Sequence, residues 1–475
     1  MEKLSNWSLL VKPTTDCNIR CEYCFASEER KKNHGKVMEY EMVAHIAKLC
    51  DQHANQIQWI WHGGEPTLVG PDWYRNVQPA FYKHYSTKFD QSMQSNGTLI
   101  NEDWFQLIDD YDIHIGISFD AFTQKTRDIQ YNSVFDNIKL LEETGDGAGV
   151  IAVITNENYN RQIELYEYFK KNFDLSPSFN QIFNTEDAIA NGLTISTDQY
   201  GEAFRNFYRY WLYDKSTNAR SERTVMSVTR HVIGDRQVVC THSDCRHSWL
   251  GISPTGEIKP CDRNFNENYV LGNIMDYNSI QEVYESENFR KYYVEVEERF
   301  KNHCEPCGYL AYCKGGCNAN SVESSGSAAG IDETYCTMFR QKFNIVYDEL
   351  RKVDLYKDQL NFNLYNLFAT HPFFPIVEIK QFLTRLGYDT SWDYSTEEKL
   401  LLESTEFKVF RVFNIYKGTK LDGHTDHVNY PIDSCNCNDF NSLKLKRLEV
   451  LKEIYSCNIE TIEELIGKQF RRVVG

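Results

Sequence analysis

Up to about residue 215 the chain alternates between short β-rich runs and amphipathic helical stretches, and this alternation limits the fold more than any other feature. The six strand-like runs are Ser8–Lys12, Ile57–Trp61, Asp90–Ser95, Ile113–Phe119, Gly149–Ile154 and Ser178–Phe183. The helical stretches between them include Tyr40–His53, Val134–Glu143 and Tyr159–Phe173. Strands that alternate with helices form a parallel sheet with right-handed crossovers. We therefore predict an α/β fold built as an open or partial barrel.

In such folds the functional residues collect on the loops that follow the carboxyl ends of the strands. The first of these loops holds three cysteines, and the second holds Gly63-Gly64-Glu65-Pro66. The third holds Asn96-Gly97, and the fourth holds Asp120. Because parallel strands end at the same edge of a sheet, we expect these four loops to converge on one face.

The cysteines of the first loop, Cys17, Cys21 and Cys24, form a C-x3-C-x2-C cluster. A [4Fe–4S] cluster normally takes four cysteine ligands, one for each iron. Three thiolates therefore leave one iron open to a ligand from outside the protein. The alternative is a structural zinc site, which normally has four closed ligands.

This spacing resembles the signature of the radical S-adenosylmethionine (SAM) enzymes, and Trp61-His62-Gly63-Gly64-Glu65-Pro66-Thr67-Leu68 looks like their GGEP motif. The resemblance implies a partial (β/α)6 TIM-like barrel in which SAM chelates the open iron. It also implies reductive cleavage of SAM to methionine and a 5′-deoxyadenosyl radical that abstracts a hydrogen atom from the substrate. An electron donor such as flavodoxin or ferredoxin is expected as a partner.

The same resemblance implies a set of SAM contacts. Gly63 and Gly64 would allow close approach of the backbone, and the carboxylate of Glu65 would hold the ammonium group of SAM. Two further segments, Met93–Thr98 and Gly116–Asp120, resemble the QTNG-like and GISLD-like segments of these enzymes. They add the cofactor-binding candidates Gln94, Asn96 and Ser118.

Tyr23 occupies the position from which family members pack against the adenine, although a plain core tyrosine is the alternative. The chain departs from the pattern at Ala26, where close relatives often carry a second aromatic residue. A carboxylate-binding arginine is usual after Asp120, and Arg127 is the one arginine in that shortened stretch. Arg127 is therefore a further candidate SAM ligand.

Eight more cysteines lie between residues 240 and 336, and from Cys245 to Cys336 they match every interval of the seven-cysteine SPASM motif. Eight thiolates can fully ligate two [4Fe–4S] clusters, which gives three clusters in the chain. A zinc ribbon would explain Cys304 and Cys307 alone. By the resemblance, the first auxiliary cluster is held by Cys240, Cys245, Cys261 and Cys317. The second is held by Cys304, Cys307, Cys313 and Cys336. Fully ligated clusters are expected to transfer electrons.

Asp262 directly follows Cys261. In the sulfatase maturases, which the chain resembles from about Leu9 to Phe339, the aspartate at this position is the base that deprotonates the substrate. Burial beside a cluster would give this carboxylate the raised pKa that a base needs. A structural cap or a salt bridge is the alternative role.

We predict three domains: a radical SAM core at 1–215, a cysteine-rich SPASM domain at 216–344 and a C-terminal α+β extension at 345–475. A long helix is expected at Thr337–Leu364 and a strand at Phe407–Tyr416. The extension could bind a leader peptide or brace the SPASM domain. Its potential zinc ligands, which ordinary polar loops would also explain, are His424, His427, Cys435 and Cys437.

The composition excludes some partners and locations. With 68 acidic against 51 basic residues the formal charge is −17, which argues against nucleic acid as the main partner. The sequence has no signal-like start and no apolar stretch of the roughly 18 residues that a membrane span needs. We therefore expect a cytoplasmic protein without a membrane partner, in which cysteines indicate metal or redox sites. Cys50 is expected to be an ordinary buried thiol.

These features predict a radical SAM/SPASM oxidoreductase that matures a ribosomally made peptide by closing a thioether or carbon–carbon crosslink. The alternative is an anaerobic sulfatase maturase, which oxidises a cysteine or serine of a sulfatase to formylglycine. A non-enzymatic iron–sulfur electron carrier is a third interpretation, but it would not need the GGEP loop or a three-cysteine site.

Overall fold

The computed structural model describes residues 3–82, 86–126, 131–144, 149–212, 222–232, 240–242, 244–263 and 265–352. The chain divides into two compact units. The first contains residues 1–204, 218–227 and 238–342, and the second contains residues 205–217, 228–237 and 343–475. Every predicted site residue that the structure describes belongs to the first unit.

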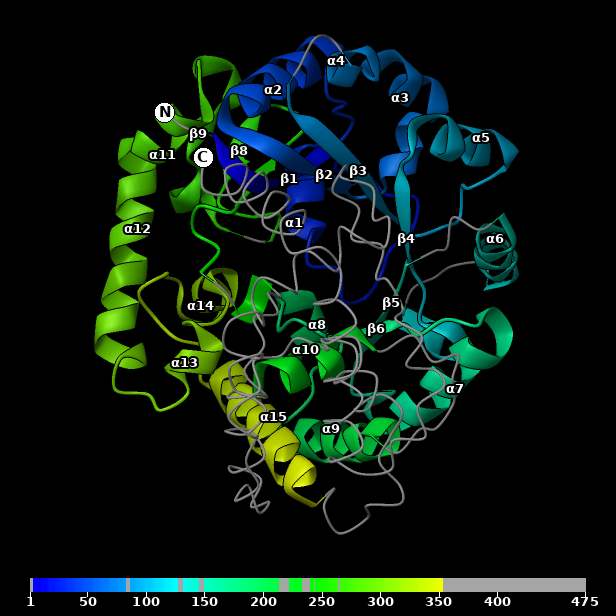
Figure 1. The fold of residues 1–475 in the computed structure, drawn as a ribbon, viewed down its shortest axis with the longest axis vertical. Helices are drawn as coiled ribbons and strands as arrows, with labels where there is room; N and C mark the ends of the chain where they lie inside the picture. Colours follow the sequence, from blue (N-terminus) through cyan, green and yellow to red (C-terminus); the bar gives the residue numbers. More distant parts are fainter. Residues whose placement is uncertain are drawn as a thin grey trace, which may run out of the picture. The chain divides into compact units, whose positions relative to one another are not determined.

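One nine-stranded sheet runs through the first unit, in the order β6-β5-β4-β3-β2-β1-β7-β8-β9 (Figure 1). The strands are β1 (Leu4–Thr14), β2 (Ala54–Gly63), β3 (Lys88–Ser95), β4 (His114–Ser118), β5 (Gly149–Ile154), β6 (Ser178–Gln181), β7 (Trp249–Ile252), β8 (Glu257–Lys259) and β9 (Gly272–Asn273). Strands β1 to β6 are parallel neighbours in chain order. The sheet is open at β6 and β9 within the described residues, so the predicted α/β fold with a partial barrel is confirmed.

Strand β7 pairs parallel with β1, on the side of β1 opposite to β2. Strands β8 and β9 then continue the sheet in antiparallel order. The cysteine-rich region therefore joins the core sheet directly through β7, which the sequence analysis did not predict.

Helices α2, α3, α5, α6 and α7 lie on the outer side of the curved sheet (Figure 1). The helices are α1 (Ser27–Lys32), α2 (Tyr40–His53), α3 (Pro71–Val77), α4 (Pro79–Tyr82), α5 (Glu102–Tyr111), α6 (Tyr131–Thr144), α7 (Gln162–Phe173), α8 (Glu186–Ala190), α9 (Thr197–Leu212), α10 (Arg223–Val232), α11 (Ile280–Glu285), α12 (Glu287–Arg299), α13 (Leu310–Cys313), α14 (Asn318–Ser325) and α15 (Glu333–Lys352). Helix α15 corresponds to the long helix expected at Thr337–Leu364 and begins four residues earlier. Its expected end and the strand at Phe407–Tyr416 lie outside the described residues.

Aromatic packing fixes which face of β2 points outward. Trp59 and Trp61 are fully buried, and their rings lie 4.8 Å from Phe81 and 5.6 Å from Trp73 respectively, both on the outer helices. Successive side chains of a strand point to opposite faces. His62 therefore points to the inner face of the sheet, away from the helices.

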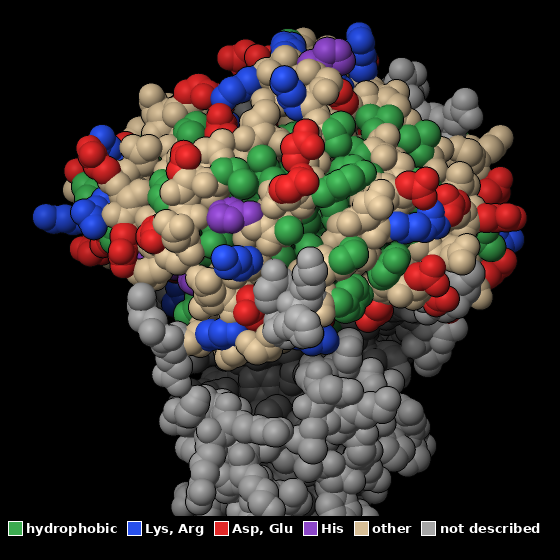
Figure 2. All heavy atoms as spheres, turned by 90° about the horizontal axis from the view of Figure 1, so that it is seen from above, with side chains coloured by type: hydrophobic (Ala, Val, Ile, Leu, Met, Phe, Trp, Pro, Cys, Tyr) green, Lys and Arg blue, Asp and Glu red, His purple; other side chains and the backbone are tan. Residues whose placement is uncertain are grey.

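The described surface carries mixed charge. Figure 2 shows acidic and basic side chains interspersed with apolar ones over one face of the molecule. Among the described residues, no helix combines the length and the apolar character that crossing a membrane requires.

The described part of the second unit consists of segments of α9, α10 and α15. Arg205 and Arg209 on α9 form ion pairs of 3.2 and 2.9 Å with the buried Glu349 on α15. The hydroxyls of Tyr208 and Thr229 lie 3.0 Å apart. These polar contacts connect α9 with α15 and α9 with α10.

Candidate functional site: three cysteine groups and a buried carboxylate

The three-cysteine loop begins where β1 ends, at Thr14. Burial raises the pKa of the Cys17 thiol, and the charges of Glu65 and Cys24 raise it further. The side-chain nitrogen Nδ2 of Asn96, from the loop after β3, lies 3.8 Å from Cys17 Sγ. The structure thus brings the first and last cysteines of the motif together and adds a hydrogen-bond donor to one of them.

The Gly63-Gly64 pair lets the second loop lie directly on the start of the cysteine loop. A Cβ at Gly63 would stand 2.3 Å from the Thr14 carbonyl oxygen, and a Cβ at Gly64 would stand 2.2 Å from that of Asp16. Any side chain at either position would force the two loops apart. The glycines are therefore required by packing, whether or not they also approach a ligand.

Glu65 is buried and accepts hydrogen bonds from its own chain on both carboxylate oxygens. Oε1 accepts from the Thr67 amide at 3.0 Å, the Thr67 hydroxyl at 2.5 Å and the Ser95 hydroxyl at 2.8 Å. Oε2 accepts from the Asn96 amide at 2.7 Å. Burial raises the pKa of Glu65, and these hydrogen bonds offset part of that effect. Glu65 therefore ties the second loop to the third, and any contact with SAM would be additional to this role.

The remaining described SAM candidates lie at the carboxyl ends of β3 and β4 and in the loops after β1 and β3. Gln94 donates to the Ser118 hydroxyl at 2.9 Å, across a position where a Cβ at Gly116 would stand 2.5 Å from Gln94 Oε1. The hydroxyl of the buried Tyr23 donates to the Asp120 carboxylate, which also accepts from the Val153 amide at 2.8 Å. The expected convergence of the four loops is thus visible in their contacts.

The sequence departs from the family pattern at Ala26 and in the stretch that contains Arg127. Ala26 is buried at the N-cap of α1. Arg127 lies outside the described residues, as do the potential zinc ligands of the extension, His424, His427, Cys435 and Cys437.

Asp262 lies between the side chains of Lys12 and His62, which belong to the first two strands of the core. Its Oδ1 is 2.7 Å from Lys12 Nζ, and its Oδ2 is 2.8 Å from His62 Nδ1. Both are ion-pair distances without the alignment of regular hydrogen bonds. Lys12 and Asp262 are buried, whereas the His62 side chain is 22% exposed. The sequence analysis identified neither Lys12 nor His62 as a site residue, although a lysine in the otherwise apolar run of β1 was a usable signal.

Local geometry explains how these residues meet. Val11 of β1 pairs with Trp61 of β2, and the register of the two strands shifts after this pair. The next residues, Lys12 and His62, both reach Asp262. A Cβ at Gly251 of β7 would stand 2.7 Å from the Cys261 carbonyl oxygen and 3.0 Å from the Asp262 amide nitrogen. Glycine at position 251 therefore lets the backbone of Cys261 and Asp262 pass close to β7, which brings the side chain of Asp262 to Lys12 and His62.

The raised pKa expected for Asp262 is wrong. Burial alone does raise the pKa of this carboxyl, but the charges and contacts of His62 and Lys12 outweigh burial and hold it below its ordinary value. Lys12 is stabilised as a cation in the same way. Burial lowers its pKa, and the charges of Asp262 and Glu29 more than reverse that effect. The group is therefore a buried ion-pair network that keeps Asp262 ionised.

One set of four thiols gathers directly beside Asp262. Burial raises the pKa of Cys245, and the charges of Cys261, Cys317 and Cys240 raise it further. Burial and the charges of Asp262, Cys317 and Cys240 likewise raise the pKa of Cys261 to about 12. The four members are Cys240, Cys245, Cys261 and Cys317. The structure thus groups cysteines that lie up to 77 residues apart in the chain.

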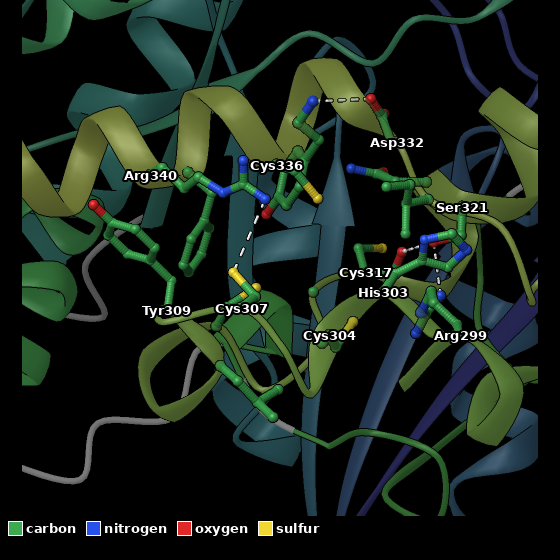
Figure 3. Close-up of a pocket in the computed structure, with 18 residues that line it drawn as sticks. Arg299, His303, Cys304, Cys307, Tyr309, Cys317, Ser321, Asp332, Cys336 and Arg340 are labelled. Atoms are coloured by element: carbon green, nitrogen blue, oxygen red, sulfur yellow. Dashed lines mark hydrogen bonds between the residues drawn. The ribbon is translucent and has the colours of Figure 1, made fainter. Parts of the chain in front are cut away.

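The other set lines a pocket between α13, α14 and α15 (Figure 3). Burial and the charges of Cys336, Cys304 and Cys307 raise the pKa of Cys313 to about 12. For Cys336, burial and the charge of Cys304 raise the pKa to about 11 against the lowering charge of Arg340. Cys304, Cys307, Cys313 and Cys336 are therefore close enough for their charges to interact.

Each set offers the four thiols that a [4Fe–4S] cluster normally takes as ligands, one for each iron. Within the described ranges, no group of three or more His, Cys, Asp or Glu side chains is placed to hold a single metal ion. Burial and mutual repulsion make thiolates unfavourable without metal, which is the expected property of ligands that metal binding must deprotonate.

The comparisons with known proteins agree with this reading. Residues 11–169 match the Radical SAM superfamily, and residues 240–317 match the iron–sulfur cluster-binding domain called SPASM. The cysteine-type anaerobic sulfatase-maturating enzyme of Clostridium perfringens is 24% identical over 368 residues, which cover 73% of this chain and 98% of that enzyme.

Solved structures share the fold. A structure of anSMEcpe with bound AdoMet (SAM) and a peptide matches with a TM-score of 0.64 and 24% identity, over 73% of this chain and 99% of that one. Streptococcus suis SuiB bound to the precursor peptide SuiA matches with a TM-score of 0.52 and 18% identity, over 70% of this chain and 76% of that one. The chain therefore carries radical SAM and SPASM domains, and it is an enzyme that uses SAM and iron–sulfur clusters.

Proposed function

We propose that this chain, a radical SAM/SPASM enzyme, oxidatively modifies a ribosomally made peptide by closing a thioether or carbon–carbon crosslink. The observation that carries the proposal is the position of Asp262. This carboxylate directly follows a cysteine of one thiol set and faces Lys12 and His62 on the inner face of the sheet. A proton acceptor thus lies beside a redox site, as an oxidation that removes hydrogen requires.

We assign three [4Fe–4S] clusters to the three cysteine groups, within a core at 1–215 and a SPASM domain at 216–344. Cys17, Cys21 and Cys24 would hold the SAM-binding cluster, and each set of four would hold one auxiliary cluster. SAM would be contacted by Tyr23, Gly63, Gly64, Glu65, Gln94, Asn96 and Ser118. When bound, these groups would supply hydrogen-atom abstraction and one-electron transfer, with flavodoxin or ferredoxin as the external electron donor.

The chain's own residues handle the proton. Lys12 keeps the Asp262 carboxylate ionised and fixed, so that it can accept a proton from the substrate. His62 Nδ1, 2.8 Å from Oδ2, holds the carboxylate from the partly exposed side of the pair.

A peptide substrate is supported by the length of the chain. The Clostridium perfringens relative aligns over nearly its whole length but over 73% of this chain. We propose that the extension at 345–475 binds a leader peptide. SuiB, which shares the fold, has been solved with its precursor peptide.

The second candidate function is that of an anaerobic sulfatase maturase. The names of the curated relatives favour it, since several are cysteine-type or serine-type enzymes of this kind. Such an enzyme would convert a cysteine or serine of a sulfatase to formylglycine.

Mass spectrometry separates the two functions. The enzyme, loaded with iron, sulfide, SAM and a chemical reductant, would be incubated with a cysteine-containing peptide encoded beside its gene, and separately with a cysteine peptide from a sulfatase. We expect the first peptide to lose two hydrogens and, if sulfur takes part, its free thiol. An aldehyde on the sulfatase peptide that hydrazide reagents capture would instead establish the maturase function.

Asp262→Asn tests the role of the base in the same assay. Deoxyadenosine should still form, because hydrogen abstraction does not need this carboxylate. Product should fall by roughly a hundredfold or more, as the loss of a general base typically causes. Unchanged product would show that Asp262 is a structural ion-pair residue.

A further inference from the structure

We infer that Arg299 couples the two SPASM clusters, as the buried counter-charge of one and, through Asn318, a hydrogen-bond partner of the other. The inference rests on the proposed ligation of the two thiol sets, and it concerns two residues that the cysteine motifs do not contain. The first set is Cys240, Cys245, Cys261 and Cys317. The second set is Cys304, Cys307, Cys313 and Cys336.

Arg299 is a fully buried cation in the pocket of the second set. It ends α12, and a π-helical turn, Phe300–Cys304, carries the chain from it to the first cysteine of that set. Figure 3 shows both Arg299 and Cys304 in the wall of the pocket. The side chain of Arg299 is 1% exposed. Burial raises the pKa of Cys304, and the charge and hydrogen bonding of Arg299 act in the opposite direction.

The hydrogen bonds of Arg299 go to neutral groups. Nη1 donates to Ser321 Oγ at 2.6 Å, and Nη2 donates to Asn318 Oδ1. The buried Nε has no regular hydrogen-bond partner, and none of the carboxylates in the described residues forms an ion pair with Arg299. A buried charge without a counter-charge is costly. An anionic group in the pocket would balance it, and a cluster with four thiolate ligands is such a group.

Asn318 connects Arg299 with the first set. Its side chain is buried, and its Nδ2 donates to the Tyr292 hydroxyl at 2.6 Å. The same Nδ2 lies 3.8 Å from Cys245 Sγ. An amide nitrogen carries two N–H groups, so it can serve both acceptors. Two buried side chains, Arg299 and Asn318, therefore join the pocket of the second set to Cys245.

This arrangement should affect the reduction of both clusters. Reduction adds one negative charge to a cluster. Nearby positive charge and hydrogen bonds to the ligand sulfurs stabilise the reduced form, more strongly in a buried site. Arginine keeps its charge at any working pH. One guanidinium should therefore raise the reduction potentials of both clusters together, which favours passage of an electron between the set beside Asp262 and the other set.

The test is a potentiometric titration followed by electron paramagnetic resonance. It uses the full chain reconstituted with iron and sulfide, with Cys17, Cys21 and Cys24 replaced by alanine so that the two SPASM clusters are observed alone. Arg299→Met should lower both midpoints. The larger shift should equal at least a tenfold change in the reduction equilibrium, about 59 mV for one electron.

Arg340→Met is the matched control. Arg340 lines the same pocket, with Nη2 3.9 Å from Cys307 Sγ, but it is exposed. Water and salt therefore screen its charge. This variant should move one midpoint, by less than Arg299→Met does.

Asn318→Leu tests the connection to the first set. It leaves the charge of Arg299 in place and removes the N–H group beside Cys245. It should lower the midpoint that shifts less in Arg299→Met and leave the other midpoint unchanged.

A shift of only one midpoint in Arg299→Met would overturn the coupling, as would shifts no larger than that of Arg340→Met. If Arg299→Met binds no iron, Asn318→Leu decides, and two unchanged midpoints there also overturn the coupling. These results would leave the proposed ligation intact. Fewer than about eight irons in the parent protein would contradict the ligation itself.

Discussion

The loops after β2, β3 and β4 of the core and the thiol sets of the SPASM region are stabilised in opposite ways. In the loops, the acidic groups are matched by donors of the chain: Glu65 accepts four hydrogen bonds, and Asp120 accepts from Tyr23 and Val153. In the sets, each thiolate raises the pKa of its neighbours. The loops should therefore keep their geometry without metal, whereas the sets need metal to offset their repulsion.

The two regions also differ in how the chain assembles them. Each loop residue follows its own strand directly, so the sheet alone positions it. The cysteines of the sets are spread over residues 240 to 336 and meet only when distant segments close. Closing long segments costs entropy, and cluster binding supplies free energy for it. The following predictions test this contrast, from the largest expected effect to the smallest.

Replacing Cys17, Cys21 and Cys24 together by alanine should abolish reductive cleavage of SAM. The variant should still bind roughly eight irons, because the eight SPASM thiolates are unchanged. Iron analysis and deoxyadenosine formation measure the two properties. Full SAM cleavage by this variant would refute the assignment of the first cluster.

Cys317→Ala should have the reverse pattern. We expect loss of about four irons, faster hydrogen exchange at 244–342 and no product, while residues 3–126 stay protected and some deoxyadenosine still forms. The matched control is Cys50→Ala, since Cys50 is buried in α2 and belongs to neither set. If both regions were equally protected from hydrogen exchange after loss of the cluster, the two regions would not differ in their need for metal.

Much of the fold could be predicted because burial of one face of a strand or helix leaves a periodic pattern of apolar residues in the sequence. The predicted strand Gly149–Ile154 and helix Tyr40–His53 have the observed ends. Strand β7 was missed because it has only four residues and pairs with a strand about 240 residues earlier. No local pattern reports such a pairing.

The residues of the candidate site that belong to a sequence motif could be predicted. The group of Lys12, His62 and Asp262 could not, because its members come from three separate segments of the chain. The pair of Lys12 and His62 depends on the register of β1 and β2, and Asp262 reaches it only over Gly251. Without knowledge of these partners, burial was the one effect on the pKa of Asp262 that the sequence indicated. The direction of its pKa shift was therefore predicted wrongly.

Lys12→Met should lower the free energy of unfolding by about 3–5 kcal/mol, the usual cost of leaving one partner of a buried ion pair alone. Chemical denaturation measures this. Lys31→Met is the matched control, because Lys31 is 69% exposed and forms its ion pair with the exposed Glu28. A cost equal to that of Lys31→Met would show that the network does not stabilise the core.

The same network predicts a pH dependence. The pKa of Asp262 is lower in the folded than in the unfolded chain. Its stabilising contribution is therefore present above the unfolded value of about 3.9 and is lost as the pH falls below it. Lys12→Met should flatten the decline of stability below about pH 4, measured by denaturation at a series of pH values.

Glu65→Gln is expected to have the smallest effect, a loss of about 1–3 kcal/mol in the free energy of unfolding. Glutamine places an NH2 group among donors of Thr67, Ser95 and Asn96, so buried donors lose their acceptor. SAM binding should weaken by a similar amount, about 1.5–3 kcal/mol, if the carboxylate also holds the ammonium group.

Equilibrium binding of SAM and denaturation, measured on the same protein, separate the two roles of Glu65. Glu28→Gln is the matched control, because Glu28 is 64% exposed and should change stability by less than about 0.5 kcal/mol. Weaker SAM binding with unchanged stability would mean that the four hydrogen bonds of Glu65 do not hold the loops. In that case the core loops, like the thiol sets, would depend on their ligand for order, and the contrast between the two regions would disappear.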